Sequence, residues 1–173
     1  KMTNYATTYG QGISVTGIQM AYAYQAMANQ GVRLDPILVQ NCTADDGTVL
    51  YEPKQNATRV VSKETAKLNL NLMEKVVEFG GVGRNAQIDG YRVAGKTGTA
   101  QLAAIAQDAK YDADAIDERL RDNAMYLGYA PHDKPTILVV VALENAGGGG
   151  STAAPLARQL MDYYFTAGVN RDE

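Results

Sequence analysis

Cysteine and histidine are almost missing from this sequence, whose 173 residues include one cysteine, Cys42, and one histidine, His132. This scarcity excludes an internal disulfide and a metal centre built from a cysteine–histidine cluster. Long hydrophobic runs are missing too, because the longest, TILVVVAL at residues 136–143, has the length of a strand. No signal peptide is recognisable. The net charge is −3 with acids and bases mixed, which excludes the basic face of a nucleic-acid-binding protein, so we expect no nucleic-acid partner.

The composition that remains is that of an ordinary globular domain, 46% hydrophobic and 20% charged. A chain of this length can form one domain with a buried core. It begins Lys1-Met2, an unusual natural start, so we expect a fragment of a longer protein.

Two segments show the apolar spacing and the end signals of helices. The first covers residues 14–31, with Ser14 or Thr16 as its N-cap and Gly31 as a left-handed terminal residue. The second covers residues 62–81. There Ser62 is the expected cap, Gly80 closes the helix, and the expected apolar stripe consists of Leu68, Leu72 and Val76.

A third helix is expected after the glycine run AGGGG at residues 146–150. We interpret the run as a native turn and not as an inserted linker, because helix signals follow at once. Ser151 is the expected cap and Pro155 lies in the first turn. The expected apolar face consists of Leu156, Leu160, Tyr163 and Tyr164.

Strands are expected in the rest of the chain. A hairpin is predicted where residues 33–42 and 48–53 flank the turn sequence TADDG. Three further candidates are residues 91–101, 124–131 and 135–145. A charged stretch at 108–122 separates the first two and is interpreted as a surface helix or a mobile excursion. The fold class we expect is α+β, with antiparallel strands and helices packed on the sheet.

The segment DGYRVAGKTGTAQ, residues 89–101, matches two motifs. Residues 90–97 fit the phosphate-binding loop G-x-x-x-x-G-K-[ST], and residues 96–98 spell the K-T-G of penicillin-interacting serine enzymes. A phosphate loop needs a buried strand before its first glycine and a helix at the lysine. Here polar residues precede Gly90, and Gly98 disfavours a helix after the lysine. We therefore prefer a strand.

In a strand, Lys96 and Gly98 face one side and Thr97 and Thr99 the other. An edge strand can pair with an extended peptide, and a glycine lets that peptide approach closely. Lys96 could attract a carboxylate, threonine hydroxyls could bond it, and strand N–H groups could stabilise an oxyanion. Alone, K-T-G is better explained as an edge-strand lysine that discourages aggregation.

Other segments accompany K-T-G in a fixed order. They are YGQGISVTGIQMAYAYQAMANQGV, GYRVAGKTGTAQ, MYLGYAP followed by ILVVVALEN, and GGGGSTAAPLARQLMDYYF. From Tyr9 to about Phe165, the chain resembles the C-terminal part of the transpeptidase domain of class B penicillin-binding proteins, with the septal division enzymes most similar.

This resemblance implies the penicillin-binding transpeptidase fold, related to serine β-lactamases, and a D,D-transpeptidase in which a serine attacks D-alanyl-D-alanine stem peptides. β-Lactams imitate that dipeptide. By motif, Lys96 supplies positive charge, Thr97 and Thr99 engage the substrate carboxylate, Gly98 admits the acyl donor, and the Thr99 N–H is an oxyanion donor. No cofactor and no metal are expected. The expected location is the extracytoplasmic face of the bacterial membrane, anchored by an N-terminal segment outside this chain, with division-complex proteins as further partners.

The family's nucleophile lies in an SxxK motif, and a second motif is SxN. The chain has three serines, Ser14, Ser62 and Ser151, and none fits either motif. We therefore expect residues 1–173 to be the C-terminal portion of one transpeptidase domain, whose upstream half carries both motifs and acts as a partner. The chain alone should be inactive. A β-lactamase or β-lactam sensor, a non-catalytic interaction module and, less favoured, a nucleotide-binding protein remain alternatives.

Three remaining features are better explained without catalysis. His132 is expected in a turn between strands, among prolines and Asp133. Cys42 is expected to be a free thiol without a role. The acidic residues at 112, 114, 117 and 118 lack the spacing of a calcium loop and are interpreted as a solvated face.

Overall fold

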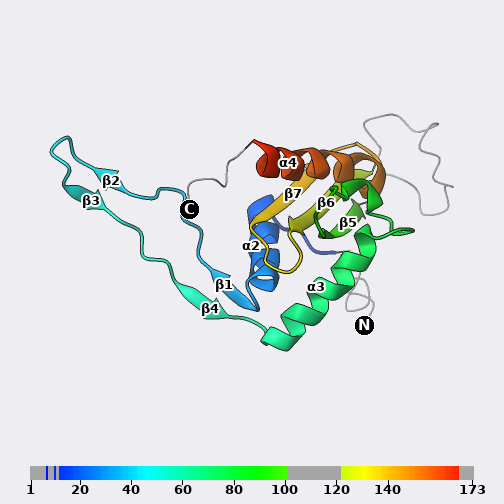
Figure 1. The fold of residues 1–173 in the computed structure, drawn as a ribbon, viewed down its shortest axis with the longest axis horizontal. Coiled ribbons are helices and arrows are strands. Elements are labelled where there is room, and N and C mark those ends of the chain that lie inside the picture. The colour runs from blue at the N-terminus through cyan, green and yellow to red at the C-terminus, as the bar shows by residue number, and fades with distance from the viewer. Residues whose placement is uncertain (1–6, 8–9, 11, 101–121, 168–173) are drawn as a thin grey trace.

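A three-stranded antiparallel sheet lies between helices in the computed structural model of the chain, which describes residues 12–100 and 122–167 together with Thr7 and Gly10 (Figure 1). The helices are α2 (Gly17–Ala28), α3 (Lys63–Val77) and α4 (Ala154–Thr166), with the short η1 (Arg84–Ala86) and the π-helical η3 (Gly149–Ala153). The strands are β1 (Val32–Leu34), β2 (Cys42–Thr43), β3 (Val49–Tyr51), β4 (Ala57–Arg59), β5 (Ala94–Ala100), β6 (Asn123–Ala130) and β7 (Ile137–Leu143). The expected α+β class is confirmed.

The sheet has the order β5-β6-β7, and both pairs of neighbours are antiparallel. Within the described residues, β5 is bonded to one neighbour and is therefore an outer strand. The register places Lys96 opposite Leu127 and Thr97 opposite Tyr126. Side chains alternate along a strand, so each pair of opposed residues shares one face of the sheet.

Helices cover both faces of this sheet. On one face, α4 packs against β6 and β7, with the core residues Tyr126, Val139, Val141, Ala157 and Met161 between them. On the other face, α2 packs on β7 and α3 packs on β5. The second core lies there and consists of Leu70, Met73, Ala94, Leu127 and Tyr129. The sheet is thus buried on both sides, which explains why β7 reads as a continuous apolar run.

The predicted caps hold for two helices. Thr16 caps α2 in a capping box with Gln19, and the Ser62 hydroxyl accepts a hydrogen bond of 3.1 Å from the Thr65 N–H at the start of α3. The prediction for Ser151 was wrong. The N-cap of α4 is Ala153, and Ser151 lies in η3, where its hydroxyl donates to the Gly148 carbonyl at 3.1 Å. The extra turn of η3 moves the start of α4 past the serine.

The predicted apolar faces of two helices were also wrong. In α3, Leu68 and Leu72 of the predicted stripe are exposed and Val76 is half-buried, whereas the buried residues are Ala66, Leu70, Met73 and Val77. In α4, Leu156, Leu160 and Tyr163 of the predicted face are exposed and Tyr164 is half-buried, while Ala154, Ala157 and Met161 are buried. Each helix carries two apolar stripes, and the one with alanines packs on the sheet because small side chains allow a close approach.

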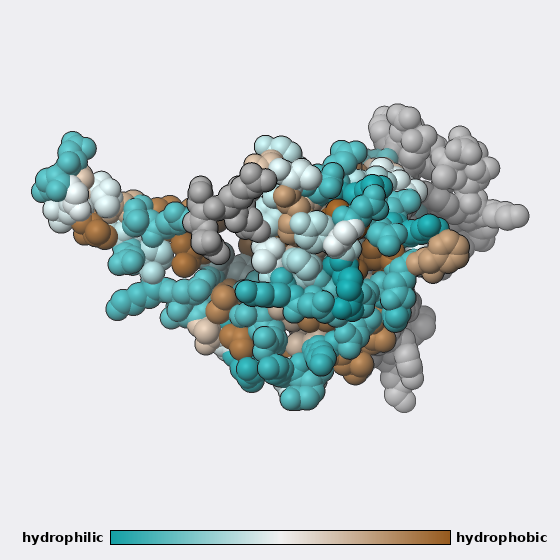
Figure 2. All heavy atoms as spheres, viewed as in Figure 1, coloured by the Kyte–Doolittle hydropathy of each residue, from teal (hydrophilic) through white to brown (hydrophobic). Residues whose placement is uncertain are grey.

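The predicted hairpin forms an arm, residues 32–59, that extends away from the sheet (Figure 1). β2 pairs with β3 around the turn at Gly47, and β1 pairs with β4 nearer the body. Apolar side chains lie at the surface of the arm (Figure 2). Leu38 is 91% exposed and Leu50 is 69% exposed. None of the helices in the described part of the chain is long and apolar enough to cross a bilayer.

The glycine run packs directly on the sheet. A methyl group added to Gly149 would collide with the carbonyl oxygens of Gly98 and Met125, and one added to Gly150 would collide with that of Val82. Only glycine allows these approaches. The run is therefore part of the fold, as expected of a native turn.

Candidate functional site

The K-T-G residues lie in the middle of β5, as the strand interpretation predicts. Because Lys96 is opposite Leu127 and Gly98 is opposite Met125, both face the side of the sheet covered by α2 and α3. Thr97 and Thr99 face the side of α4 and the glycine run, and the Thr99 hydroxyl accepts a hydrogen bond of 3.3 Å from the Gly149 N–H. The alternation expected from the sequence therefore holds.

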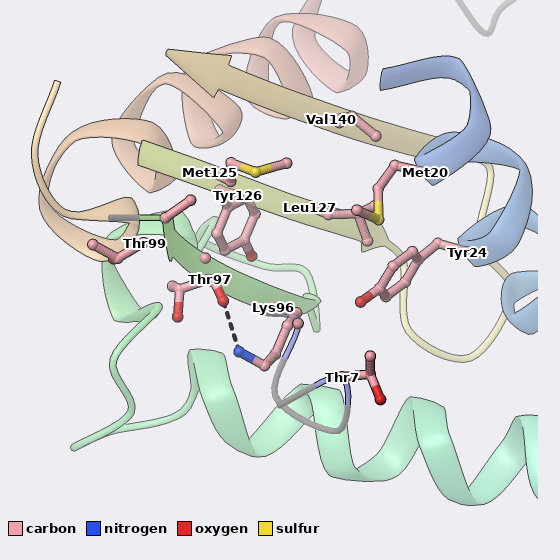
Figure 3. A pocket seen from close by; sticks show the side chains of 13 residues that line it. Thr7, Met20, Tyr24, Lys96, Thr97, Thr99, Met125, Tyr126, Leu127 and Val140 are labelled. Atoms are coloured by element: carbon pink, nitrogen blue, oxygen red, sulfur yellow. Dashed lines mark hydrogen bonds between the residues drawn. The ribbon is translucent and has the colours of Figure 1, made fainter. Parts of the chain in front are cut away.

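A pocket of about 490 Å³ opens along these residues (Figure 3). Lys96, Thr97, Gly98, Thr99 and Ala100 form one wall. The other walls consist of Met125, Tyr126, Leu127 and Val140 from the neighbouring strands, Met20 and Tyr24 from α2, and Thr7 and Gly10. The pocket is thus bounded by all three strands and by α2, and none of its lining residues comes from α3.

The charged group of the site is accessible. Lys96 is exposed, and its ammonium donates a hydrogen bond of 2.6 Å to the Thr97 carbonyl (Figure 3). None of the ion pairs in the described part of the chain involves Lys96. The ammonium keeps donors free for an anion in the pocket. Gly98 is half-buried, and a methyl group added there would lie 3.2 Å from the Met125 side chain.

Tyr126 supports β5 from the opposite face. Its phenol is fully buried, and a methyl group on either Gly95 or Gly128 would collide with the ring. The aromatic ring therefore lies over a cross-strand pair of glycines, an arrangement that pins strand register. Burial raises the pKa of Tyr126 above its usual range, so the hydroxyl stays protonated at neutral pH. The sequence analysis did not identify Tyr126 as a residue that supports the site. The signal that could have found it is the pair of glycines, Gly95 and Gly128, that face each other on β5 and β6.

The phosphate-loop alternative does not fit this geometry. β5 begins at Ala94, inside the supposed loop, and stays extended through Thr97 to Ala100. No helix begins at the lysine, so the converging N–H groups of a phosphate loop are not formed. The strand interpretation of Lys96 is confirmed.

The serines have structural positions. Ser62 caps α3, Ser151 bonds within η3, and Ser14 is exposed ahead of α2. None of them lines the pocket beside Lys96.

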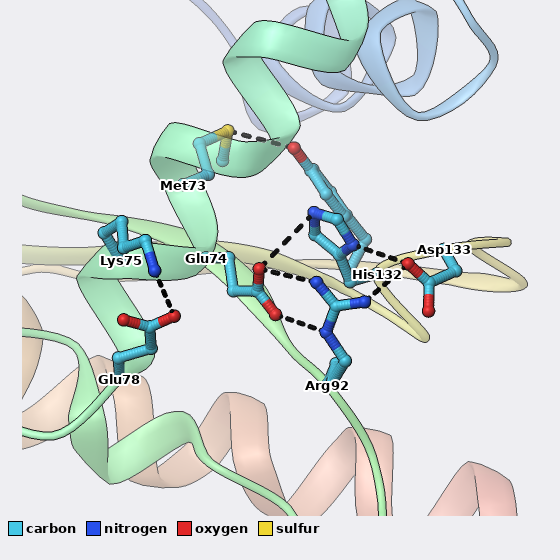
Figure 4. Close-up of polar contacts among 8 residues, drawn as sticks. Met73, Glu74, Lys75, Glu78, Arg92, His132 and Asp133 are labelled. Carbon is cyan, nitrogen blue, oxygen red and sulfur yellow. Dashed lines mark hydrogen bonds and ion pairs between the residues drawn. The ribbon is translucent and has the colours of Figure 1, made fainter.

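His132 lies in the predicted turn between β6 and β7, but in a setting that the sequence did not indicate (Figure 4). It is buried, and its Nδ1 is 3.0 Å from an Asp133 oxygen. Its Nε2 lies 3.8 Å from Glu74 of α3. Arg92, two residues before β5, bonds both Glu74 oxygens at 2.6 and 2.8 Å and Asp133 at 2.7 Å.

This cluster ties α3 to the start of the K-T-G strand. The Arg92 guanidinium is the main cause that holds the pKa of Glu74 below its usual 4.5, and contact with His132 lowers that of Asp133. The pKa of Arg92 is raised in return by Glu74. Arg92 bonds both carboxylates and Asp133 bonds His132, so the cluster positions α3 and the start of β5 relative to each other.

The other candidate residues show no site. Cys42 is exposed on β2 as a free thiol. The acidic residues at 112, 114, 117 and 118 lie outside the described residues, as does most of the charged stretch. Among residues 12–100 and 122–167, no group of acidic, histidine or cysteine side chains could hold a metal ion.

Comparison with known proteins gives a family for most of the chain. Residues 2–162 match the family model described as penicillin binding protein transpeptidase domain. The chain is 42% identical over 165 residues to the peptidoglycan D,D-transpeptidase MrdA of Haemophilus influenzae, covering 90% of this chain and 25% of that protein. It is 38% identical over 164 residues to stage V sporulation protein D of Bacillus subtilis, covering 90% and 23%.

A solved structure is similar as well. Penicillin binding protein 3 of Mycobacterium tuberculosis, in complex with ampicillin, superposes with a TM-score of 0.75 at 31% identity, covering 93% of this chain and 36% of that one. The chain thus spans about a quarter of the length of the curated relatives it matches. The names of these relatives do not distinguish a septal division enzyme from other transpeptidases, so the resemblance to septal enzymes stays a prediction. The chain belongs to the penicillin-binding protein transpeptidase domain family.

Proposed function

We propose that residues 1–173 are the C-terminal portion of one transpeptidase domain in a peptidoglycan D,D-transpeptidase, and that they supply the K-T-G wall of its acyl-transfer site. The observation that carries the proposal is the set of Lys96, Thr97, Gly98 and Thr99 on an outer strand, along a pocket of about 490 Å³. A strand with one free edge can pair with an extended peptide, and the ammonium beside it attracts a carboxylate.

The proposed reaction divides its work between two halves of the domain. A serine of the upstream half attacks the carbonyl of the penultimate D-alanine, its proton passes to a base, and D-alanine leaves as the peptide bond breaks. An amine of a second stem peptide then attacks the acyl-enzyme and releases the serine. The nucleophile and its activating lysine come from outside this chain, because no serine here has a lysine three residues on.

The residues of β5 have distinct proposed roles. Lys96 holds positive charge in the groove, and Thr97 and Thr99 engage the carboxylate of the stem peptide or of a β-lactam. Gly98 lets the acyl donor lie close to the strand. The Thr99 N–H donates to the oxyanion, an effect of about 3–4 kcal/mol per donor where it has been removed. No cofactor takes part. The whole protein is proposed to act at the outer face of the bacterial membrane, held there by an N-terminal anchor.

Intact mass measurement with and without benzylpenicillin tests the proposal. The chain is combined with an upstream half bearing SxxK, or studied within the full-length protein. We expect the serine-bearing half to gain one penicillin mass and this chain alone to gain none. Lys96→Ala should slow acylation by about a hundredfold or more, as for loss of a preorganised electrostatic group. Acylation that is absent in the complete protein, or equally fast without Lys96, overturns the proposal and favours an interaction module.

A further inference from the structure

A second pocket, of about 600 Å³, opens between η1 and α4, away from the α2 and α3 side of the sheet. Every residue that lines it is polar or charged except one proline: Arg84, Asn85, Gln87, Asp89, Pro155, Arg158 and Gln159. On α4, Pro155, Arg158 and Gln159 have i, i+3, i+4 spacing and therefore share one face of the helix. The buried residues Ala154, Ala157 and Met161 lie on a neighbouring face of α4.

The two arginines of this pocket differ from the other arginines that the structure describes. Arg33 pairs with Asp35, Arg59 donates to two carbonyl groups, and Arg92 bonds Glu74 and Asp133. Within the described residues, the guanidinium groups of Arg84 and Arg158 have no hydrogen bond or ion pair. A guanidinium carries five donors in a planar fork that matches carboxylate or phosphate oxygens.

The η1 side of the pocket is held in place. The Arg84 guanidinium lies over the Phe79 ring, 4.4 Å from its centre, and this contact leaves its N–H edge free. The Asn85 side chain donates to the Gly150 carbonyl at 2.9 Å. With two arginines against Asp89, the charged lining has a positive excess of one, which favours an anionic ligand.

The pocket is connected to the K-T-G strand through one intervening residue, Gly150. Gly150, which Asn85 bonds, approaches β5 so closely that a methyl group added to it would lie 3.7 Å from the Thr97 side chain. A peptide bound along β5 would therefore have a polar, positively charged hollow beside it, on the side of the sheet opposite to Lys96. The amide groups of Asn85, Gln87 and Gln159 could donate to and accept from a peptide backbone.

We propose that Arg84 and Arg158 bind a side-chain carboxylate of an acidic peptide, as a second anchoring point for the stem peptide beside the K-T-G groove. This inference rests on the proposed function. It names a specificity-determining contact that does not touch the reacting atoms. An exposed charge pair contributes little alone, so two guanidinium groups acting together should give about a three- to tenfold preference for an acidic peptide, weakened by salt.

The test uses the complete protein and two N-acetylated peptides, Glu-Lys-D-Ala-D-Ala and Gln-Lys-D-Ala-D-Ala. The measured quantity is the ratio of the concentrations at which each halves the rate of penicillin acylation. We expect the Glu peptide to act at about three- to tenfold lower concentration. The double variant R84Q/R158Q should bring the ratio to about one, and R33Q, on the arm, should leave it unchanged. A ratio within one variant is insensitive to a general loss of activity.

The outcomes are separable. Penicillin acylation of the unmodified protein tests the proposed function alone. Given acylation, equal action of the two peptides, or a preference that survives in R84Q/R158Q, overturns the inference.

Discussion

The two faces of the β5-β6-β7 sheet are packed in different ways. On the α4 face, the helix contributes Ala154, Ala157 and Met161, each 0% exposed, and Tyr126 fills the space over the aligned glycines. On the other face, α2 packs on β7 and α3 packs on β5, and a pocket opens along β5 and β6 beside Lys96. The comparison indicates that one face supplies rigidity to β5 and the other supplies access to it.

The largest expected effect concerns the packed face. Met161→Ala removes a fully buried side chain and should lower the free energy of unfolding by about 2–5 kcal/mol, because the surrounding core cannot close the cavity. Met20→Ala, on the pocket face, is the matched control. Met20 is half-buried beside an open space, so its loss should cost less than about 1 kcal/mol. Urea unfolding of the chain measures both, and equal losses would contradict the difference between the faces.

The next effect concerns the contact between the glycine run and β5. Gly149→Ala would place a methyl group against the carbonyl oxygens of Gly98 and Met125, and backbone cannot yield as a side chain can. We expect a loss of about 1–3 kcal/mol in urea unfolding.

Gly148→Ala is the control for that variant. Its added methyl group would meet only the Ser151 hydroxyl, at 2.9 Å, which can rotate away. A tolerated Gly149→Ala, or equal losses in the two variants, would show that the run does not support β5.

A smaller effect is expected where Glu74 and Arg92 tie α3 to β5. The pKa of Glu74 is lowered in the folded chain, so its stabilising contribution is present above its ordinary value of 4.5 and is lost as the pH falls below it. Glu74→Gln should cost about 1–2 kcal/mol at pH 7 and much less near pH 3. Urea midpoints at both pH values measure this.

Lys75→Gln on the same helix is the control. Its ion pair with Glu78 is exposed and contributes little, so this variant should change the free energy of unfolding little at either pH. If Glu74→Gln lowers the free energy of unfolding as much at pH 3 as at pH 7, the contact between Glu74 and Arg92 does not stabilise the fold as an ion pair.

The sheet could be predicted from sequence because strand alternation is a local property. Residues 91–101 alternate in a way that places Lys96 and Thr97 on opposite faces, and the structure agrees. The covering faces of the helices could not be predicted in the same way. In α3 the stripe of Leu68 and Leu72 and the stripe of Leu70 and Met73 both fit helical spacing, and only packing on the sheet decides which is buried.

The contacts among Glu74, Arg92 and Asp133 could not be predicted from the sequence for a related reason. Arg92 meets Glu74 from 18 residues away and Asp133 from 41, and no local pattern marks such partners. His132 was placed correctly in its turn, but its burial depends on α3 arriving beside it. The lysine of the site was found from sequence because K-T-G is a contiguous motif, whereas Met20 and Tyr24 of the pocket come from a separate helix.

The smallest effect on stability is expected at Lys96, whose substitution is expected to slow penicillin acylation the most. Lys96 is exposed and bonds only a neighbouring carbonyl, so Lys96→Ala should change the free energy of unfolding by less than about 0.5 kcal/mol. Arg33→Ala, an exposed residue on the arm, is the control. Urea unfolding of the chain, beside penicillin acylation of the complete protein, separates the two quantities. A loss of several kcal/mol would mean that the lysine holds the sheet together, and the pocket face would then be structural like the α4 face.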